Sequence, residues 1–389
     1  MKKTRAKGAK PTRLNLPITR PTLDAFSAYV SFFKESIKTG KLTSHKFVQE
    51  FEEKAAKYLG VKHCVAVSSC SSGLMLTLKG LDLKGEVIVP SFTFAATAHP
   101  LLWNNLTPVF ADVDPKTYTI DPKEVEKLIT PRTSAILATH AFGVMCDVKK
   151  LEAIARKHKL RLIFDAAHAF GSAREGAKTG NFGDAEVFSL SPIKVLTAAE
   201  GGLVATNNEV LAQYVRMGRN YGDDGTNNML FAGLSARMSE FHGAIALRSL
   251  GSLNANLKNR RAKSAYLKKA LVHIEPSLQF QVTPNGSEVT NYIFTIVIDP
   301  KVLGYTRDDV KLFLSKEGID TRKYFFPPLH TQPPYVTFAP KAEELPVTDY
   351  LTNNILALPM YSHITKEDID RVVRAFKKFK SMYGSINKV

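Results

Sequence analysis

The sequence predicts an α/β protein in which a large domain with an open, mostly parallel sheet is followed by a smaller α+β domain. Three observations favour this class. Short apolar runs alternate with polar or amphipathic stretches between residues 61 and 207, as expected for strand–helix units. Residues 210–280 have the pattern of long helices, and strands and helices then follow without that alternation. The chain of 389 residues is also long enough to bury two cores.

The composition and the basic start of the chain predict how the chain divides into domains and in which compartment it lies. Residues 1–13 are basic and lack an apolar period, so we expect a disordered tail, a large domain at 14–255 and a small domain at 256–389. The chain has no run of about 18 apolar residues, so we expect no membrane span. No apolar segment follows the basic start, so we expect no secretory signal. The three cysteines (Cys64, Cys70 and Cys146) lack C-x-x-C spacing, which favours a reducing compartment, the cytoplasm, and no metal site.

The first predicted elements belong to the large domain. A helix from about Ser44 places Phe47, Phe51 and Ala55 on one face and ends at Gly60. Seven strands are expected at the apolar runs Cys64–Val67, Val87–Val89, Pro108–Ala111, Ala135–Ala138, Leu162–Phe164, Val187–Leu190 and Leu203–Ala205. We expect ligands at the carboxyl ends of these strands, where open α/β sheets collect them.

The later elements carry clear start signals. A helix is expected from Pro122, with Asp121 as its cap. A strand is expected at Tyr292–Ile298. The helices expected at Thr306–Glu317 and Thr365–Lys380 each begin with a capping-box pattern. This mixture, without a parallel repeat, predicts the small α+β domain.

One lysine stands on the turn between two predicted strands. Lys194 follows the run Val187–Leu190 and precedes Glu200 and a Gly-Gly pair. A lysine held above a sheet edge can act as a nucleophile toward a carbonyl group. Taken alone, such a turn more often carries an ordinary surface lysine, so the neighbouring strand ends decide between the two interpretations.

Other strand ends supply groups that complement this lysine. Ser71 and Ser72 open a helix whose free N–H groups and dipole favour a phosphate, although a plain Ser-rich cap has the same pattern. Asp165 ends a buried strand, where it can pair with a protonated ring nitrogen or merely cap the next helix, and His168 follows it. Phe94, just past another strand, can lie flat on a ring or belong to the core.

Together these side chains are the parts that a pyridoxal-phosphate site needs. Lys194 can hold the aldehyde of the cofactor, and Asp165 can keep the pyridine nitrogen cationic. The ring then withdraws electrons from the substrate carbon, and the lysine carries a proton between that carbon and the cofactor. Ser189, five residues before the lysine, can reach the phosphate.

Longer motifs resemble those of the DegT/DnrJ-type nucleotide-sugar aminotransferases over nearly everything after residue 15. These motifs are Pro90–Phe94, Asp165–His168, Phe182–Asp184, Phe188–Lys194, Glu200–Gly202, Gly233–Glu240 and Tyr324–His330. The resemblance implies a fold-type-I enzyme with a mixed seven-stranded sheet, pyridoxal phosphate as cofactor, and a homodimer with each active site at the subunit interface. It further implies that glutamate supplies nitrogen to a keto group, at C3 or C4, of a nucleotide-linked deoxy sugar.

The resemblance also implies a role for each cofactor-site residue. Lys194 would hold the aldehyde, and Asp165 would pair with the pyridine nitrogen. His168 would lie beside the ring hydroxyl, and Phe94 would stack on the ring. The residues that would hold the phosphate are Ser71, Ser72 and Ser189.

A second group of residues is implied at the substrate or at the neighbouring subunit's site. These residues are Thr43, Tyr221, Ser235, Arg237, Tyr324 and His330. Two positions depart from the family pattern: Ser235 stands where many relatives carry Asn, and Ala199 stands where Gly is usual.

Other functions share parts of this pattern. Dehydratase relatives replace the lysine by His, so Lys194 favours transamination, whereas relatives that act on cyclitol or amino-aromatic precursors keep the lysine. The net charge of +17 is compatible with a regulatory, nucleic-acid-binding relative, but the chain has no helix-turn-helix, zinc-finger or RNA-binding motif. We therefore predict sugar transamination, without a nucleic-acid or membrane partner.

Overall fold

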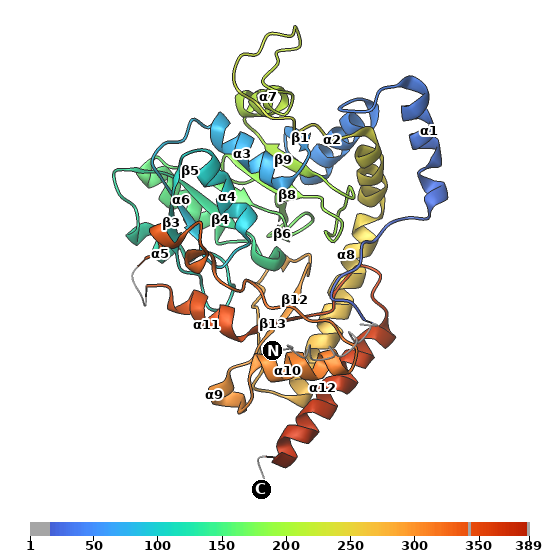
Figure 1. Cartoon of the computed structure of the whole chain (residues 1–389), viewed down its shortest axis with the longest axis vertical. Coiled ribbons are helices and arrows are strands. Elements are labelled where there is room, and N and C mark those ends of the chain that lie inside the picture. Colours follow the sequence, from blue (N-terminus) through green and yellow to red (C-terminus); the bar gives the residue numbers. More distant parts are fainter. Residues whose placement is uncertain (1–15, 341–343, 387–389) are drawn as a thin grey trace, which may run out of the picture.

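The computed structural model describes residues 16–340 and 344–386, and its centre is a mixed sheet of seven strands (Figure 1). The strands are β1 His63–Val67, β2 Glu86–Pro90, β3 Thr107–Ala111, β4 Thr133–Thr139, β5 Arg161–Asp165, β8 Ala185–Ser189 and β9 Gly202–Thr206. Their order is β1-β9-β8-β5-β4-β2-β3, and β9 runs against the other six. The seven predicted strands and the mostly parallel sheet are confirmed.

Helices cover both faces of this sheet. They are α1 Val30–Thr39, α2 Lys46–Leu59, α3 Cys70–Gly80, α4 Ala95–Trp103, α5 Pro122–Lys127, α6 Val148–His158, α7 Glu209–Gly218 and α8 Glu240–Ile274, with the short turns η1 Phe26–Ala28 and η2 Ala141–Gly143. Successive strand residues face opposite sides. Val187 and Val204 therefore pack with α3, α4 and α7, while Phe188 and Leu203 pack with α2 and α8. The helices α5 and α6 lie on the same face of the sheet as α2 and α8, and they pack over β2, β4 and β5.

The second domain is a small antiparallel sheet with its own helices. Its strands are β10 Gln279–Phe280, β12 Phe294–Val297 and β13 Ile355–Leu358. Its helices are α9 Pro300–Leu303, α10 Arg307–Lys316, α11 Pro346–Asn354 and α12 Lys366–Ile386, with the turns η3 Leu329–Thr331 and η4 Val336–Phe338. Leu271 of α8, Val310 of α10 and Phe376 of α12 share one core beside the sheet. The α+β prediction is confirmed, although β13 was not predicted. A third small sheet joins β6 Ala173–Arg174, β7 Ala177–Lys178 and β11 Ser287–Glu288.

The prediction of long helices through residues 210–280 is wrong for its middle part. The chain is irregular between the end of α7 at Gly218 and the start of α8 at Glu240. Gly222 has a left-handed φ of 86°, and a Cβ there would lie 2.0 Å from the carbonyl oxygen of Phe231. A helix cannot pass through such a residue. The predicted domain boundary at 255/256 falls inside α8, and the predicted tail at 1–13 lies outside the described residues.

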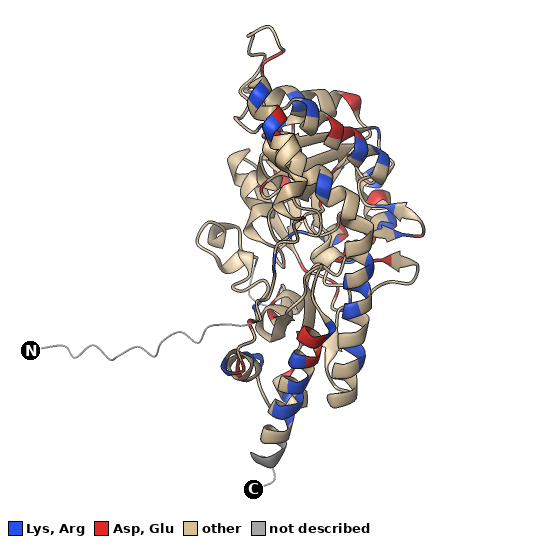
Figure 2. Cartoon of the chain, turned by 90° about the vertical axis from the view of Figure 1, so that its right-hand side faces the viewer, with Lys and Arg blue, Asp and Glu red and all other residues tan. Residues whose placement is uncertain are grey.

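The long helix α8 joins the two domains. Its 35 residues make it about 52 Å long, and it lies against α2 at one end and α12 at the other (Figure 1). Arg260, fully buried on α8, donates hydrogen bonds to Ser362 Oγ and to the carbonyls of Asn291 and Tyr292. Lys and Arg recur along α8 and α12 (Figure 2). No helix in the described ranges is long and apolar enough to cross a membrane.

The start of α2 is capped by a side chain that is distant in sequence. The carboxylate of Glu240, 1% exposed, accepts hydrogen bonds from the N–H groups of His45 and Phe47 at 2.7 Å and of Val48 at 3.2 Å. The first N–H groups of a helix have no partner within the helix, and its positive dipole end favours a negative charge. Glu240 therefore fixes α2 against the start of α8.

Replacement of this cap should destabilise the chain. Glu240→Ala leaves three N–H groups without an acceptor, two of them buried, so we expect the free energy of unfolding to fall by about 2–4 kcal/mol. Glu240→Gln keeps one acceptor oxygen and should lose roughly half as much. Urea denaturation followed by circular dichroism measures both. A loss below about 1 kcal/mol for Glu240→Ala would contradict this role.

Candidate active site

The strands of the large sheet end at a cavity of about 370 Å³. Its walls are the segments that follow β1, β2, β5 and β8, closed on the far side by Tyr292, Arg322, Tyr324 and Phe325. The predicted site residues that line it are Ser71, Phe94, Asp165, His168, Ser189, Lys194 and Tyr324. The structure therefore brings together residues that span 253 positions of the chain, as the shared strand edge predicts.

Asp165 lies at the base of the cavity as the last residue of β5. It is 4% exposed, and one carboxylate oxygen accepts a hydrogen bond of 2.6 Å from Thr97 Oγ1. The other oxygen accepts a hydrogen bond of 3.0 Å from the N–H of Ala167. No ion pair with a basic side chain occurs in the part of the chain that the structure describes. The carboxylate is thus oriented and has no contacting cation among the described residues, as a site for a cationic ring nitrogen requires.

Lys194 lies on the turn between β8 and β9, as predicted. Leu190 N donates to Gly201 O at 2.9 Å and Ala198 N to Leu190 O at 2.8 Å, which closes this turn. Burial lowers the pKa of Lys194 because the ammonium loses water, and the charge of Asp165 partly opposes this shift. A lower pKa increases the fraction of neutral amine, which is the nucleophilic form. The Lys194 Nζ atom lies 4.3 Å from the centre of the Tyr292 ring.

The start of α3 forms an anion cradle. The N–H groups of Cys70 and Ser71 have no acceptor within the described residues. The Ser71 side chain lines the cavity, whereas the Ser72 hydroxyl accepts from Ser69 N at 3.1 Å and donates to Ser69 O at 2.9 Å. Ser72 thus completes the cap of the helix, and Ser71 is left for a ligand. A Cβ on Gly202 would lie 2.4 Å from Ser69 O, so only glycine lets β9 approach this turn.

His168 is part of the aromatic wall of the cavity. Its ring stacks on Tyr292 with centroids 4.4 Å apart, and its Nδ1 atom accepts a hydrogen bond of 3.2 Å from the N–H of Phe142. Burial lowers the pKa of His168 well below its usual value, and the Lys194 charge adds to this effect. The imidazole is therefore neutral with its proton on Nε2, and that N–H can donate to a ring oxygen.

Phe94 has an unusual position for a phenylalanine. It is 63% exposed, although it precedes the mostly buried helix α4 and borders the cavity. An apolar ring of this exposure is not part of the core, so the structure excludes the core interpretation that the sequence allowed. It leaves a flat surface for a ligand ring.

The other predicted residues do not line this cavity. Tyr221 Oη donates to Ser235 Oγ at 3.0 Å, and the Arg237 guanidinium lies 5.5 Å from the centre of the Tyr221 ring. These three residues belong to the irregular segment before α8. Thr43 pairs with Ser239 in an isolated bridge. His330 Nδ1 lies 2.8 Å from Ser91 Oγ, near the cavity but outside its lining.

Among the lining residues that the sequence analysis did not predict, three bear directly on the chemistry of the cavity. Thr97 lies on α4 and donates a hydrogen bond to the carboxylate of Asp165. In the sequence, the only indication of this role is that Thr97 stands one helical turn after Thr93. Tyr292 and Arg322 come from the second domain, about 100 or more residues after Lys194 in the chain. No local pattern marked either residue, because only the packing of the two domains brings them to the strand ends.

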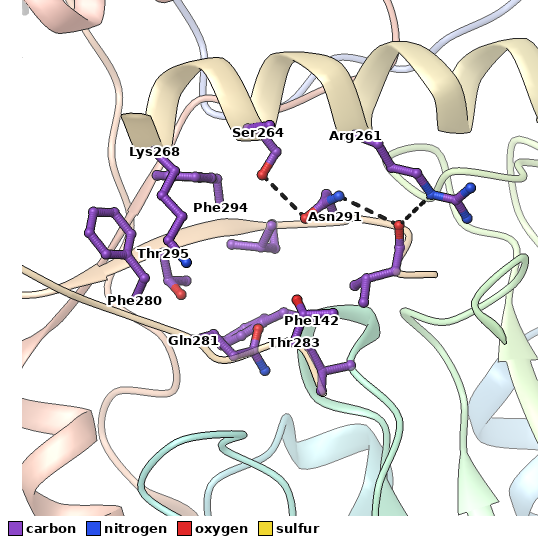
Figure 3. Close-up of a pocket in the computed structure, with 14 residues that line it drawn as sticks. Phe142, Arg261, Ser264, Lys268, Phe280, Gln281, Thr283, Asn291, Phe294 and Thr295 are labelled. Carbon is purple, nitrogen blue, oxygen red and sulfur yellow. Dashed lines mark hydrogen bonds between the residues drawn. The ribbon is translucent and has the colours of Figure 1, made fainter. Parts of the chain in front are cut away.

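A second cavity, of about 210 Å³, lies beside α8 and is a different feature (Figure 3). Its polar groups are largely paired: Ser264 donates to Asn291 Oδ1 at 3.2 Å, and Arg261 donates to the carbonyl of Val289 at 3.0 Å. Phe142 separates it from the first cavity, because its ring stacks at 5.4 Å on Phe325. The predicted site residues do not line it.

The first cavity fits pyridoxal phosphate. Free amides beside Ser71 suit its phosphate, the uncompensated Asp165 suits its ring nitrogen, and the exposed Phe94 suits its ring face. A buried lysine of lowered pKa suits its aldehyde. On a mixed seven-stranded sheet, these features define a fold-type-I enzyme that uses pyridoxal phosphate.

Comparison with known proteins gives the family. The sequence model of the DegT/DnrJ/EryC1/StrS aminotransferase family matches residues 27–377, and the chain belongs to this family. It is 35% identical to GDP-perosamine synthase of Caulobacter vibrioides over 335 residues, which cover 85% of this chain and 89% of that protein. It is 36% identical to a UDP-N-acetyl-3-dehydro-alpha-D-glucosamine 3-aminotransferase of Acidithiobacillus ferrooxidans, covering 84% and 87%. The structure of DesI with its TDP-sugar product superposes with a TM-score of 0.90 at 35% identity, covering 98% and 97%.

The turn that carries Lys194 contains a residue whose backbone conformation is strained, and a substitution by glycine can relieve this strain. Ala199 has a left-handed φ of 66°, which costs a residue with a Cβ about 1–2 kcal/mol. We expect Ala199→Gly to raise the free energy of unfolding by about 0.5–1 kcal/mol, after the greater freedom of glycine in the unfolded chain is subtracted. The matched control Ala198→Gly, at a buried neighbour without a positive φ, should lower it. Equal losses in both variants, measured by thermal unfolding, would contradict the prediction.

Proposed function

We propose that the protein transfers an amino group from glutamate to a keto group of a nucleotide-linked deoxy sugar, at C3 or C4. One observation carries the chemistry: the buried Lys194 and the uncompensated Asp165 line the same cavity at the strand ends. The sugar class is supported by the relatives at 35% and 36% identity, whose names are those of nucleotide-sugar enzymes. The product would enter amino-sugar or polysaccharide biosynthesis.

Each cofactor-site residue then has a task. When bound, pyridoxal phosphate supplies the electron sink that makes a substrate C–H bond acidic. Asp165 holds the proton on the ring nitrogen, and Thr97 keeps the carboxylate oriented. The Lys194 amine removes and returns the proton at the substrate carbon, since its lowered pKa leaves it able to act as a base. His168 Nε2 donates to the ring hydroxyl, and Phe94 covers the ring.

The phosphate would be held at the start of α3. The N–H groups of Cys70 and Ser71 and the hydroxyl of Ser71 are available, and the helix dipole adds to them. Ser189 Oγ, in long contacts of 3.4 and 3.5 Å with Ser191, lines the same cavity and would join them. Ser72 contributes by shaping the cap rather than through its hydroxyl, which is already paired. Tyr324 and His330 would face the sugar nucleotide on the side of the second domain.

We also propose a homodimer whose sites lie between the subunits. Large apolar side chains are exposed in and near the irregular segment before α8, where Tyr221, Met229 and Leu230 are 47%, 51% and 56% exposed. Patches of this kind favour a partner surface. Tyr221, Ser235 and Arg237 would then reach the neighbouring site, and Thr43 would lie beside them through its bridge to Ser239.

The cytoplasm is the compartment that we propose for this enzyme. Its three cysteines are buried free thiols. Thiols stay reduced in a reducing compartment, and nucleotide sugars are made there.

Removal of the lysine tests the core of the proposal. The purified protein with pyridoxal phosphate should be yellow, and borohydride should fix the cofactor on Lys194, as peptide mass spectrometry can verify. Lys194→Ala should reduce turnover by at least about 10⁴-fold, because both the attachment point and the base are lost. A colourless protein that ignores added pyridoxal phosphate would overturn the enzyme assignment.

The role of Asp165 predicts a separation of binding from catalysis. Asp165→Asn keeps the shape of the site and the hydrogen bond with Thr97, but it no longer holds a proton on the ring nitrogen. We expect the variant to retain the cofactor and to lose about 10²-fold or more in kcat, as is typical when a charge that acts in the transition state is removed. Near-normal turnover would count against this role.

The substrate is best identified by direct assay. Keto-sugar nucleotides with guanosine, uridine or thymidine should be supplied with glutamate, and NMR of the product gives the position of the new amine. Conversion of a cyclitol or amino-aromatic precursor, with no conversion of any sugar nucleotide, would replace the proposed acceptor.

A further inference from the structure

The second cavity, beside α8, has a positively charged lining to which the catalytic chemistry gives no task (Figure 3). Lys268 and Arg261 line it, and no Asp or Glu of the described residues does. The catalytic cavity differs in this respect, because Asp165 and Glu200 line it beside its cations. A hollow walled by basic side chains without an acid attracts an anion.

Lys268 is the cation of this lining that remains free. Its side chain extends from α8 toward Thr295, and its Nζ atom lies 5.3 Å from the centre of the Phe280 ring (Figure 3). It has no acidic partner in the part of the chain that the structure describes, whereas Arg261 pairs with Glu288 at 2.6 Å. The aromatic face steadies the ammonium without neutralising it, so its charge is available to a ligand.

Thr295 adds a buried hydroxyl to the same wall. It lies on β12 and is 5% exposed, and its hydroxyl has no hydrogen-bond partner within the described ranges. Buried hydroxyls usually have a partner, because an unpaired one has lost its hydrogen bonds with water. A ligand oxygen that contacts Lys268 can accept a hydrogen bond from Thr295 as well. The pair therefore points to a ligand with more than one acceptor oxygen.

The other walls limit the size of the ligand. The amide nitrogen of Gln281 donates to the carbonyls of Thr117 at 2.7 Å and Ala141 at 3.0 Å, so its oxygen is left on the cavity side. This oxygen can accept from a hydroxyl group of the ligand. The volume of about 210 Å³ is smaller than that of most ligand pockets, which run from roughly 300 Å³ upward. The cavity therefore suits a compact oxyanion, such as a phosphate or a short carboxylic acid.

The second cavity shares a wall with the catalytic one. Phe142 lines the second cavity, and its ring stacks on His168 and Phe325 of the first, with centroids 6.0 Å and 5.4 Å apart. Its N–H group donates to His168 Nδ1 at 3.2 Å. Its left-handed φ of 54° is held by the surrounding packing. Likewise, Asn291 lines the second cavity while the next residue, Tyr292, lines the first.

We propose that the second cavity binds a small oxyanion through Lys268 and Thr295, and that the bound anion braces Phe142 and, through it, His168. The site is separate from the catalytic cavity and from the phosphate cradle at the start of α3. The proposal goes beyond the proposed transamination and does not depend on it. Phe142 is in this respect a positioning residue, because it acts on the catalytic wall through His168.

Calorimetric titration of the cofactor-loaded enzyme with inorganic phosphate, and separately with malonate, tests the binding. The cofactor fills the cradle of α3, so added phosphate has to bind elsewhere. Lys268→Gln should weaken binding by about 10-fold or more, the loss expected for a charged hydrogen bond. Thr295→Val keeps the shape of the wall and should weaken binding by about threefold. The tighter of the two anions identifies the ligand as a phosphate or a carboxylate.

Lys269→Gln is the matched control. Lys269 is the exposed neighbour on α8 and does not line the cavity, so this variant should bind both anions as the wild type does. Equal losses in the two lysine variants, or a wild-type enzyme that binds neither anion at millimolar concentration, would overturn the proposal. If the chain takes up no cofactor, the proposed function fails, and the same comparison of variants still tests the site.

Hydrogen exchange tests the bracing of the shared wall. At about ten times the dissociation constant of the anion, exchange at the amide of Phe142 should slow by up to about tenfold, because a ligand that binds only the closed state opposes opening in proportion to its concentration. The same anion concentration should leave this exchange unchanged in Lys268→Gln. Mass spectrometry of a peptide that spans the turn η2 measures both. An anion that binds the wild type without slowing this exchange would overturn the coupling to the catalytic wall.

Discussion

The buried negative charge of Asp165 is the constraint on which the rest of the site depends. A carboxylate that is 4% exposed, with a hydroxyl, an N–H group and the Cys70 thiol as neutral partners, is costly by an amount on the order of several kcal/mol. Thr97 and Ala167 orient it without neutralising it. A cationic ring nitrogen held at this place would supply the missing charge, and cofactor binding would then stabilise the folded chain.

The two domains divide the chemistry between them. The strand ends of the large sheet provide the groups that the cofactor needs, namely a cradle, a carboxylate and the lysine. The second domain provides Tyr292, Arg322 and Tyr324, which line the opposite wall of the cavity. This division explains how one cavity can accept two unlike substrates in turn, because the cofactor groups stay fixed while the opposite wall offers distinct contacts.

The sequence was most informative where a local pattern decides the structure. Apolar runs located all seven strands of the large sheet, and positions one to five residues past three of these runs located Lys194, Asp165 and Phe94. Helix capping was predicted as well where both partners are close in the chain, as for Thr306 and Asp309.

Two of the features that the sequence analysis missed depend on a partner that is remote in the chain, and two others depend on a close local contact that hydrophobic patterns do not record. Glu240 caps a helix almost 200 residues earlier, and Arg322 joins the site through the packing of β13. The break before α8 follows from the close approach of Gly222 to Phe231, which no apolar period records. The position of Ser72 at the start of α3 also predicts a phosphate ligand, but its hydroxyl is already hydrogen-bonded to Ser69.

The continuity of α8 limits how the enzyme can open. Many two-domain enzymes admit substrates by rotating the domains about a flexible linker. Here one covalent connection between the domains is the body of a helix about 52 Å long, and the buried Arg260 binds it to the second domain from within. A rotation would have to bend this helix or break those hydrogen bonds. The hydrogen bonds of Arg260 and the length of α8 therefore favour opening through side chains and loops at the mouth of the cavity over rotation of whole domains.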